Sequence, residues 1–180
     1  MAMEPSTIGA EELLIITGSM GSGKSTVLGA ATDLLTLQGI PHAAIDLDTL
    51  GIYHLPIEVD GSDLGFRNLQ CVWGNYAAFG LRRLLLASAI ETRTALEACR
   101  QAVAAKRTVI CRLRASLETM QRRVRLREPG PFQQDFVARV AKLDDMLDRA
   151  QLEDFSIANE DSPVTGVAHD MLVRAGWLGG

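Results

Sequence analysis

The sequence contains no apolar run long enough to cross a membrane and only three cysteines. A membrane-spanning helix needs about 20 consecutive apolar residues, whereas the longest runs here have the length of strands, so we expect no membrane association. Cys71, Cys99 and Cys111 are odd in number and lack the spacing of a metal site. This favours buried, reduced thiols and a cytoplasmic location. Residues 1–12 contain no basic residue, which does not fit a signal peptide.

Positive charge is scarce as well. The chain has 18 lysines and arginines against 22 aspartates and glutamates, which gives a net charge of −4. A protein that binds nucleic acid in general needs a basic surface, so we expect no nucleic-acid partner. What the chain does have is 180 residues with 47% apolar and 22% charged side chains. These values indicate a single globular domain over residues 1–180.

The most informative segment, residues 18–25, has the sequence G-S-M-G-S-G-K-S. It matches the Walker A phosphate loop, whose backbone N–H groups surround a β-phosphate while the lysine pairs with β/γ oxygens and the hydroxyl binds Mg²⁺. An apolar strand pattern precedes it, and a helix pattern follows that adds a positive N-terminus. We therefore expect ATP and Mg²⁺ as cofactors. The predicted cofactor-binding residues are Gly18, Ser19, Met20, Gly21, Ser22, Gly23, Lys24, Ser25 and Thr26.

Strand and helix patterns alternate along the whole chain. Strands are expected at 13–17, 42–47, 84–90, 108–113 and 155–158, and helices at 24–38, 68–80, 93–104, 116–128, 132–150 and 162–176. Strands separated by helices predict a parallel sheet that is covered on both faces, which is an α/β fold.

Two carboxylates, Asp46 and Asp48, follow the second predicted strand. Ligands bind at the carboxyl ends of the strands in an open parallel sheet, so both residues are expected beside the phosphate loop. One could bind Mg²⁺ together with Ser25, and the other could orient and deprotonate an attacking hydroxyl. The pattern does not decide which is the base. A turn cap at Asp48 and a solvated Asp46 are the alternative interpretation.

Seven arginines lie between residues 107 and 127, namely Arg107, Arg112, Arg114, Arg122, Arg123, Arg125 and Arg127. Guanidinium groups can grip the transferring phosphoryl group in bidentate fashion. We predict that Arg123 and Arg127 are catalytic and that Arg114 and Arg122 bind the cofactor, on a flap bounded by Arg114 and Pro131. A solvated helix face is the alternative.

These features together resemble the small-molecule kinases of the adenylate-kinase-like P-loop group, which includes shikimate kinase, gluconate kinase, adenylylsulfate kinase and chloramphenicol phosphotransferase. The resemblance implies a three-layer fold with a five-stranded parallel sheet of order 2-3-1-4-5. It implies an arginine-bearing lid at about 114–131, and it places residues 159–163 beside the adenine. Only the phosphate loop is a sharp match. No Walker B aspartate ends the third strand, where the sequence offers Ser88 and Glu91.

The acceptor is expected to bind at about residues 51–76. This segment offers an aromatic, mildly polar set of side chains: Tyr53, His54, Phe66, Arg67, Trp73, Asn75 and Tyr76. The predicted substrate-binding residues are Asp48, Arg67, Asn75 and Tyr76, whereas the helical spacing of Trp73 favours a core position.

The sequence thus predicts an ATP-dependent phosphotransferase that acts on a hydroxyl group of a small molecule. The acceptor could be a metabolite, an adenylylsulfate-like nucleotide or a natural product such as an antibiotic. A nucleoside or nucleotide kinase and a non-transferring P-loop NTPase with a regulatory or accessory role are the alternatives. The identity of the acceptor, the choice between ATP and GTP, and the oligomeric state are left open.

Overall fold

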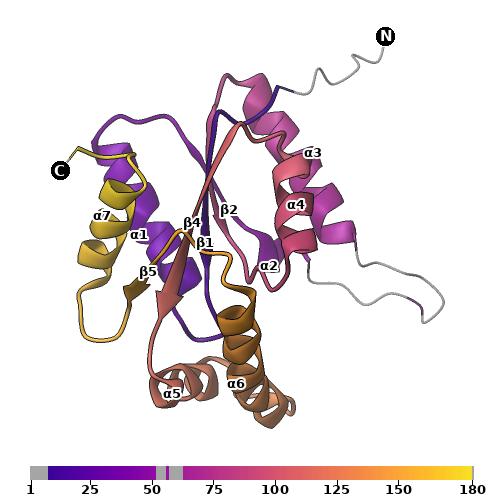
Figure 1. Cartoon of the computed structure of the whole chain (residues 1–180), viewed down its shortest axis with the longest axis vertical. Helices are drawn as coiled ribbons and strands as arrows, with labels where there is room; N and C mark the ends of the chain where they lie inside the picture. The colour runs from indigo at the N-terminus through magenta and orange to yellow at the C-terminus, as the bar shows by residue number, and fades with distance from the viewer. Residues whose placement is uncertain (1–7, 52–55, 57–62, 180) are drawn as a thin grey trace.

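A five-stranded parallel sheet forms the centre of the molecule (Figure 1). The computed structural model describes residues 8–51, 56 and 63–179. The strands are β1 (Glu12–Thr17), β2 (Ala43–Asp46), β3 (Arg83–Ala87), β4 (Arg107–Arg114) and β5 (Phe155–Ala158). Their order is β2-β3-β1-β4-β5, and every pairing is parallel. The predicted fold class and strand order are confirmed.

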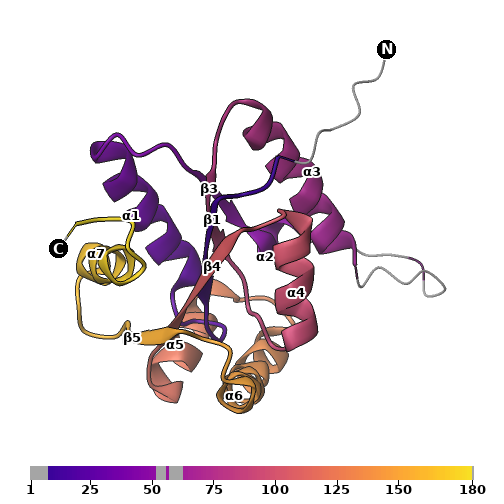
Figure 2. The same cartoon turned by 45° about the horizontal axis from the view of Figure 1, so that its top comes forward.

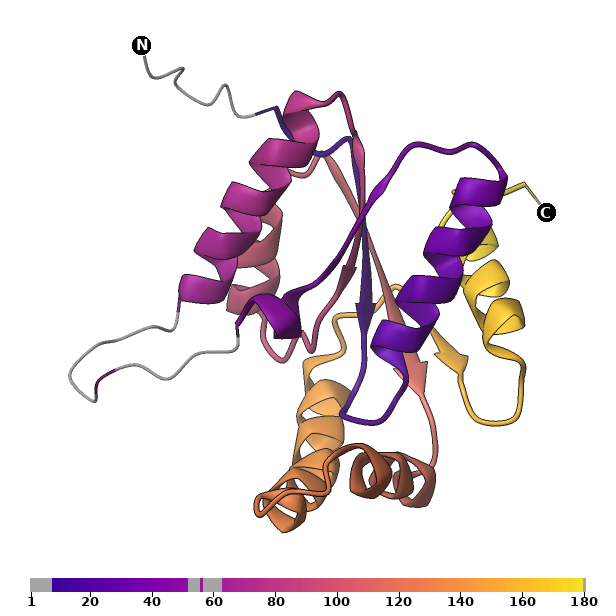
Figure 3. The same cartoon turned by 180° about the vertical axis from the view of Figure 1, so that it is seen from behind.

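Helices cover both faces of the sheet, and a further pair lies beyond its end. The helices are α1 (Lys24–Leu37), α2 (Leu47–Leu50), α3 (Leu64–Ala78), α4 (Arg93–Ala102), α5 (Leu117–Arg127), α6 (Gln133–Ala150) and α7 (Val164–Arg174). In Figure 2, α1 and α7 lie on one face, and α3 and α4 lie on the other. The pair α5 and α6 lies past the carboxyl ends of the strands (Figures 1 and 3). In the part of the chain that the structure describes, no helix is both long and apolar enough to cross a membrane.

Two apolar cores separate the layers. One lies between the sheet and α1 and α7, and the other lies between the sheet and α3 and α4. The residues of β1 alternate between them: Leu14 and Ile16 face the first core, and Leu13 and Ile15 face the second. This is why the central strand is apolar throughout, since a strand buried on both faces has no solvated side. Trp73 packs in the second core, as predicted.

The element boundaries differ from the predicted ones mainly next to the site. The short helix α2 was not predicted; the Asp46 side chain caps it by accepting a hydrogen bond from the Asp48 N–H, at 3.1 Å. Helix α3 begins four residues earlier than expected, at Leu64. All three cysteines are free, but Cys71 is exposed, so the expectation that all three are buried was wrong. Cys71 lies on an outer position of α3, between residues whose side chains pack inward.

Candidate active site

The phosphate loop joins the end of β1 to the start of α1, at the carboxyl edge of the sheet (Figure 3). Its glycines are required for two reasons. Gly21 and Gly23 have φ values of 78° and 96°, which other residues rarely adopt. A Cβ atom would also lie 2.4 Å from the Met120 carbonyl oxygen at Gly21 and 2.3 Å from the Asn159 amide nitrogen at Gly23. The loop is therefore packed tightly against α5 and the end of β5.

The serine side chains inside the loop point into the protein. Ser19 Oγ donates a 2.8 Å hydrogen bond to the carbonyl of Val140 on α6, and Ser22 is fully buried. Their predicted contribution to phosphate binding would then come from backbone N–H groups, as the motif requires. Met20 packs with Met120 and Val124 of α5, so the loop and the helical pair share a small apolar core.

Two side chains from distant parts of the chain hold the carbonyl groups of this loop. Asn159 Nδ2 donates to the Ser22 carbonyl at 2.7 Å. Arg123 Nη1 donates to the Gly21 carbonyl at 3.2 Å and to the Asn159 carbonyl at 3.0 Å. Asn159 is 7% exposed, so its amide is shielded from competing water. These bonds hold the carbonyl groups of Gly21 and Ser22 in place.

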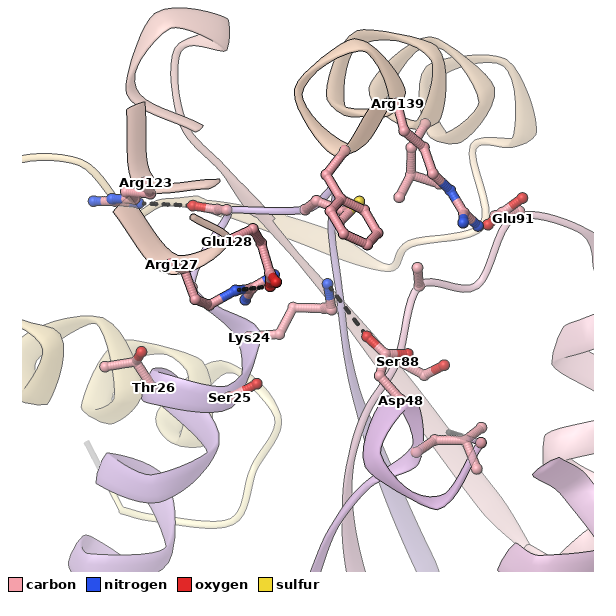
Figure 4. Close-up of a pocket in the computed structure, with 18 of the residues that line it drawn as sticks. Lys24, Ser25, Thr26, Asp48, Ser88, Glu91, Arg123, Arg127, Glu128 and Arg139 are labelled. Atoms are coloured by element: carbon pink, nitrogen blue, oxygen red, sulfur yellow. Dashed lines mark hydrogen bonds and ion pairs between the residues drawn. The ribbon is translucent and has the colours of Figure 1, made fainter. Parts of the chain in front are cut away.

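A cavity of about 1120 Å³ opens beside the loop. Basic side chains that line it come from Lys24, Arg123, Arg127 and Arg139, and carboxylates come from Asp48, Glu91 and Glu128. Its apolar lining includes Leu47, Phe66 and Phe136. Figure 4 shows Lys24 between Arg127 on one side and Asp48 on the other. The cavity is thus somewhat larger than most ligand pockets, which measure about 300–1,000 Å³.

Lys24 extends from the start of α1 across the loop. Its Nζ donates to the carbonyls of Gly18 at 3.1 Å and Ser19 at 3.4 Å, and it lies 3.9 Å from Asp48 Oδ2. Burial lowers the pKa of the Lys24 ammonium, although the carboxylates of Asp48 and Asp46 oppose this effect. Partial burial raises the pKa of Asp48, and the positive charge of Lys24 acts to lower that pKa. A lysine and a carboxylate thus face one another in the cavity.

The two predicted carboxylates have different surroundings. Asp46 Oδ2 accepts a 2.5 Å hydrogen bond from Ser25 Oγ, and its Oδ1 accepts the N–H of Asp48. Asp48 lines the cavity with its side chain 58% exposed. Asp46 is therefore held beside Ser25 of the loop, whereas Asp48 is open to the cavity.

The predicted arginines separate into two groups. Arg123 and Arg127 line the cavity, and Arg127 Nε donates to Glu128 at 2.8 Å. The structure does not bring Arg114 and Arg122 into the cavity wall: Arg114 pairs with Asp148 on α6, and Arg122 lies on an exposed position of α5. Residues 117–127 form a helix packed on the phosphate loop. A lid that moves remains a prediction.

The predicted acceptor residues are also divided. Gly65 and Phe66, at the start of α3, line the cavity, but Arg67, Asn75 and Tyr76 do not. Tyr76 lies ten residues beyond Phe66, which is about 15 Å along the helix. The structure therefore gives no support to a substrate role for Asn75 and Tyr76. Tyr53 and His54 lie outside the described residues.

Sequence reasoning missed the contribution of α6, which places Phe136, Arg139 and Leu143 in the cavity wall. These residues share one face at a helical spacing, but the same spacing is typical of an ordinary core face. Ser88 and Glu91, the polar residues that follow β3 in place of a Walker B aspartate, also line the cavity.

Helix α6 is held in place by a buried arginine. Arg112 on β4 has 0% exposure, and its guanidinium contacts Asp144 at 2.8 Å, Asp148 at 2.9 Å and Glu153 at 3.4 Å. Its burial disfavours the charge, but the hydrogen bond that it donates to Asp144 and the nearby carboxylates keep the pKa of Arg112 above its usual value. Arg112, counted in the basic cluster of the sequence, is thus a structural residue that positions α6.

No protein-family model matches the sequence, and no curated protein matches it significantly. Solved structures resemble it in fold. The tunicamycin resistance protein of Deinococcus radiodurans has a TM-score of 0.65 at 18% identity, covering 93% of this chain and 97% of its own. The APS kinase of Mycobacterium tuberculosis, in complex with AMPPNP and APS, has a TM-score of 0.63 at 20% identity, with 91% and 96% covered.

The shikimate kinase of Acinetobacter baumannii, in complex with shikimate, has a TM-score of 0.60 at 18% identity and covers 92% of each chain. At these identities the likeness concerns the fold. It agrees with the fold and strand order described above. The chain therefore has the kinase-like P-loop fold that small-molecule kinases share.

Proposed function

We propose that this protein is an ATP-dependent phosphotransferase that transfers the γ-phosphoryl group to a hydroxyl group of a small molecule. The observation that supports this most directly is the position of Asp48. Its carboxylate lines the cavity 3.9 Å from Lys24 Nζ, opposite the phosphate loop. An enzyme that only hydrolyses ATP also needs a residue that orients water, but it does not need a cavity of this size beside that residue.

The phosphates of ATP fit the loop as it is built. The glycines allow a backbone turn that other residues rarely adopt. Asn159 and Arg123 hold the carbonyl groups of Ser22 and Gly21 in place. Lys24 would exchange its contacts with the Gly18 and Ser19 carbonyls for the β/γ oxygens. Arg127, which also lines the cavity, would offset charge on the transferring group.

Ser25 and Asp46 would hold Mg²⁺. Both present oxygen atoms, which this ion prefers, and the 2.5 Å approach between them shows that they converge. When bound, the ion would neutralise charge on the β- and γ-phosphates. With Asp46 committed to this role, Asp48 is the better candidate for the base.

In the proposed step, Asp48 accepts the proton of the acceptor hydroxyl while the hydroxyl oxygen forms a bond to the γ-phosphorus. The bond from that phosphorus to the β–γ bridging oxygen breaks, and ADP leaves. The raised pKa of Asp48, caused by partial burial and opposed by Lys24, makes it a better proton acceptor than a solvated aspartate.

The three free cysteines, two of them buried, suit the reducing cytoplasm.

The test is ADP release by the wild-type protein with and without a panel of hydroxylated acceptors. We expect release that depends on an acceptor. Asp48→Asn should lower kcat about 10²–10⁴-fold, the usual contribution of a general base, while the affinity for Mg·ATP stays the same. ATP hydrolysis that no acceptor accelerates would instead favour a regulatory or accessory NTPase.

A further inference from the structure

The side chain of Ser19 joins the phosphate loop to helix α6. Its hydroxyl donates a 2.8 Å hydrogen bond to the backbone carbonyl of Val140, which lies 121 residues further along the chain, and both residues are 0% exposed. Because Val140 lies inside α6, the helix already supplies its carbonyl with an N–H partner, and a carbonyl oxygen can accept a second donor. The serine bond is therefore an additional link, which α6 does not need in order to satisfy its own backbone.

Val140 lies in the middle of the stretch of α6 that faces the cavity. Phe136, Arg139 and Leu143 all line the cavity, and this stretch covers about 10 Å of helix. Burial raises the pKa of Asp48, and Arg139 lies close enough for its charge to act in the opposite direction. A change in the position of α6 relative to the loop would therefore move three side chains of the cavity wall.

The backbone of Ser19 belongs to the part of the loop that Lys24 contacts. The Lys24 ammonium donates to the Ser19 carbonyl at 3.4 Å and to the Gly18 carbonyl at 3.1 Å. In the proposed function, Lys24 exchanges these contacts for phosphate oxygens when ATP binds. Ser19 thus has its carbonyl in the nucleotide site and its hydroxyl on α6.

We propose that Ser19 is a positioning residue. Its hydroxyl fixes the cavity-facing stretch of α6 to the phosphate loop, so that the binding of Mg·ATP stabilises this stretch. By linkage, a second ligand that contacts α6 binds more tightly once Mg·ATP is bound, and the reverse also holds. The inference rests on the binding of Mg·ATP that the proposed function requires, and it does not depend on the identity of the acceptor.

Hydrogen–deuterium exchange of the folded protein, with and without saturating Mg·ATP, tests the proposal. The measured quantity is the gain in amide protection that Mg·ATP gives to residues 136–143, compared with the gain in the phosphate loop, residues 18–25. In the wild type we expect a gain in both segments. In Ser19→Ala the gain in residues 136–143 should fall about fivefold, the effect of losing one buried hydrogen bond. The loop should keep its gain.

The gain distinguishes positioning from a purely structural role. If Ser19 only stabilised the fold, Ser19→Ala would lower the protection of residues 136–143 equally with and without Mg·ATP, and the gain would keep its wild-type value. That result would overturn the proposal. It would mean that the apolar packing of Met20 against Val140 is sufficient to hold α6.

The matched control is Thr32→Val, which removes a hydroxyl and keeps the shape of the side chain. Thr32 Oγ1 also donates to a helix carbonyl, that of Leu28 at 2.9 Å, but this carbonyl belongs to its own helix, α1. The gain in residues 136–143 should therefore stay at the wild-type value. A fall as large as that in Ser19→Ala would show that the effect does not come from the contact with α6, and the proposal would be wrong.

Failure of the proposed function gives a different result. If folded wild-type protein does not bind Mg·ATP in a calorimetric titration, the proposed function is contradicted, and this inference falls with it. If Mg·ATP binds but residues 136–143 of the wild type gain no protection, the proposed function stands and only the role of Ser19 is overturned.

Discussion

The phosphate loop and the α5–α6 pair face the same cavity, but they are held in different ways. The loop is specified by eight consecutive residues, and its glycines alone permit its backbone turn. The pair α5–α6 reaches the site through contacts between distant residues, such as Arg112 with Asp144 and Asp148. The comparison shows that a binding loop can be local in sequence, whereas the groups that surround its ligand depend on the tertiary structure.

The largest expected effect concerns the loop. Lys24→Ala should lower acceptor-dependent turnover by about 10³-fold, the upper end of the range for removal of one preorganised electrostatic contact. The fold should remain, because the Lys24 ammonium bonds only to loop carbonyls and Asp48 among the described residues. Steady-state kinetics together with a circular dichroism melt would check both points, and a turnover within tenfold of the wild-type value would contradict the role of Lys24.

The next effect concerns the helical pair. Arg112→Ala should cost about 3–5 kcal/mol of unfolding free energy, because it leaves the carboxylates around a buried site without their cation. The matched control is Arg149→Ala, whose 77% exposed side chain pairs with Asp145 on the surface; it should cost less than about 1 kcal/mol. Urea unfolding measures both values. An equal loss of unfolding free energy in the two variants would show that Arg112 does not anchor α6.

A smaller effect is expected where the two regions meet. Asn159→Ala removes the hydrogen bond to the Ser22 carbonyl and should weaken Mg·ATP binding about fivefold to tenfold, as expected for a net loss of about 1 kcal/mol. Asn75→Ala, on an exposed part of α3 outside the cavity wall, is the control and should bind Mg·ATP like the wild type. Titration with a fluorescent ATP analogue distinguishes the two. Unchanged affinity in Asn159→Ala would mean that the loop does not depend on this bond.

The smallest effect is a pH-dependent change in stability at Asp48. Its folded-state pKa lies above the ordinary 3.8, because partial burial outweighs the attraction of Lys24. Its contribution to stability is therefore complete below about pH 3.8 and is lost as the pH rises through the folded-state value. Asp48→Asn avoids this loss, so its Tm should exceed that of the wild type by about 1–2 °C near pH 7 and match it near pH 3.5. A lower Tm for Asp48→Asn at neutral pH would contradict this assignment.

The sequence was sufficient for the sheet order, the phosphate loop and the carboxylates at the end of β2, because each depends on a local pattern or on the resemblance to a known group. It was not sufficient for α6. Arg139 and Phe136 reach the cavity only because α6 is held against β4, and no local signal distinguishes them from surface or core residues of any helix. Arg112 is the opposite case: its place in a basic cluster of the sequence suggested a ligand-binding or surface residue, but the structure buries it completely.

The acceptor residues were harder to predict for a geometric reason. Asn75 and Tyr76 lie on the same helix as Phe66, but a helix rises 1.5 Å per residue, so only its first turn reaches the cavity. Proximity in sequence therefore overstated their proximity in space.

Calorimetric titration of the folded protein with Mg·ATP tests the central claim most directly. The account predicts a saturable heat for one site per chain and the loss of that heat in Lys24→Ala. Folded wild-type protein that gives no heat and no thermal protection with Mg·ATP or Mg·GTP would contradict it.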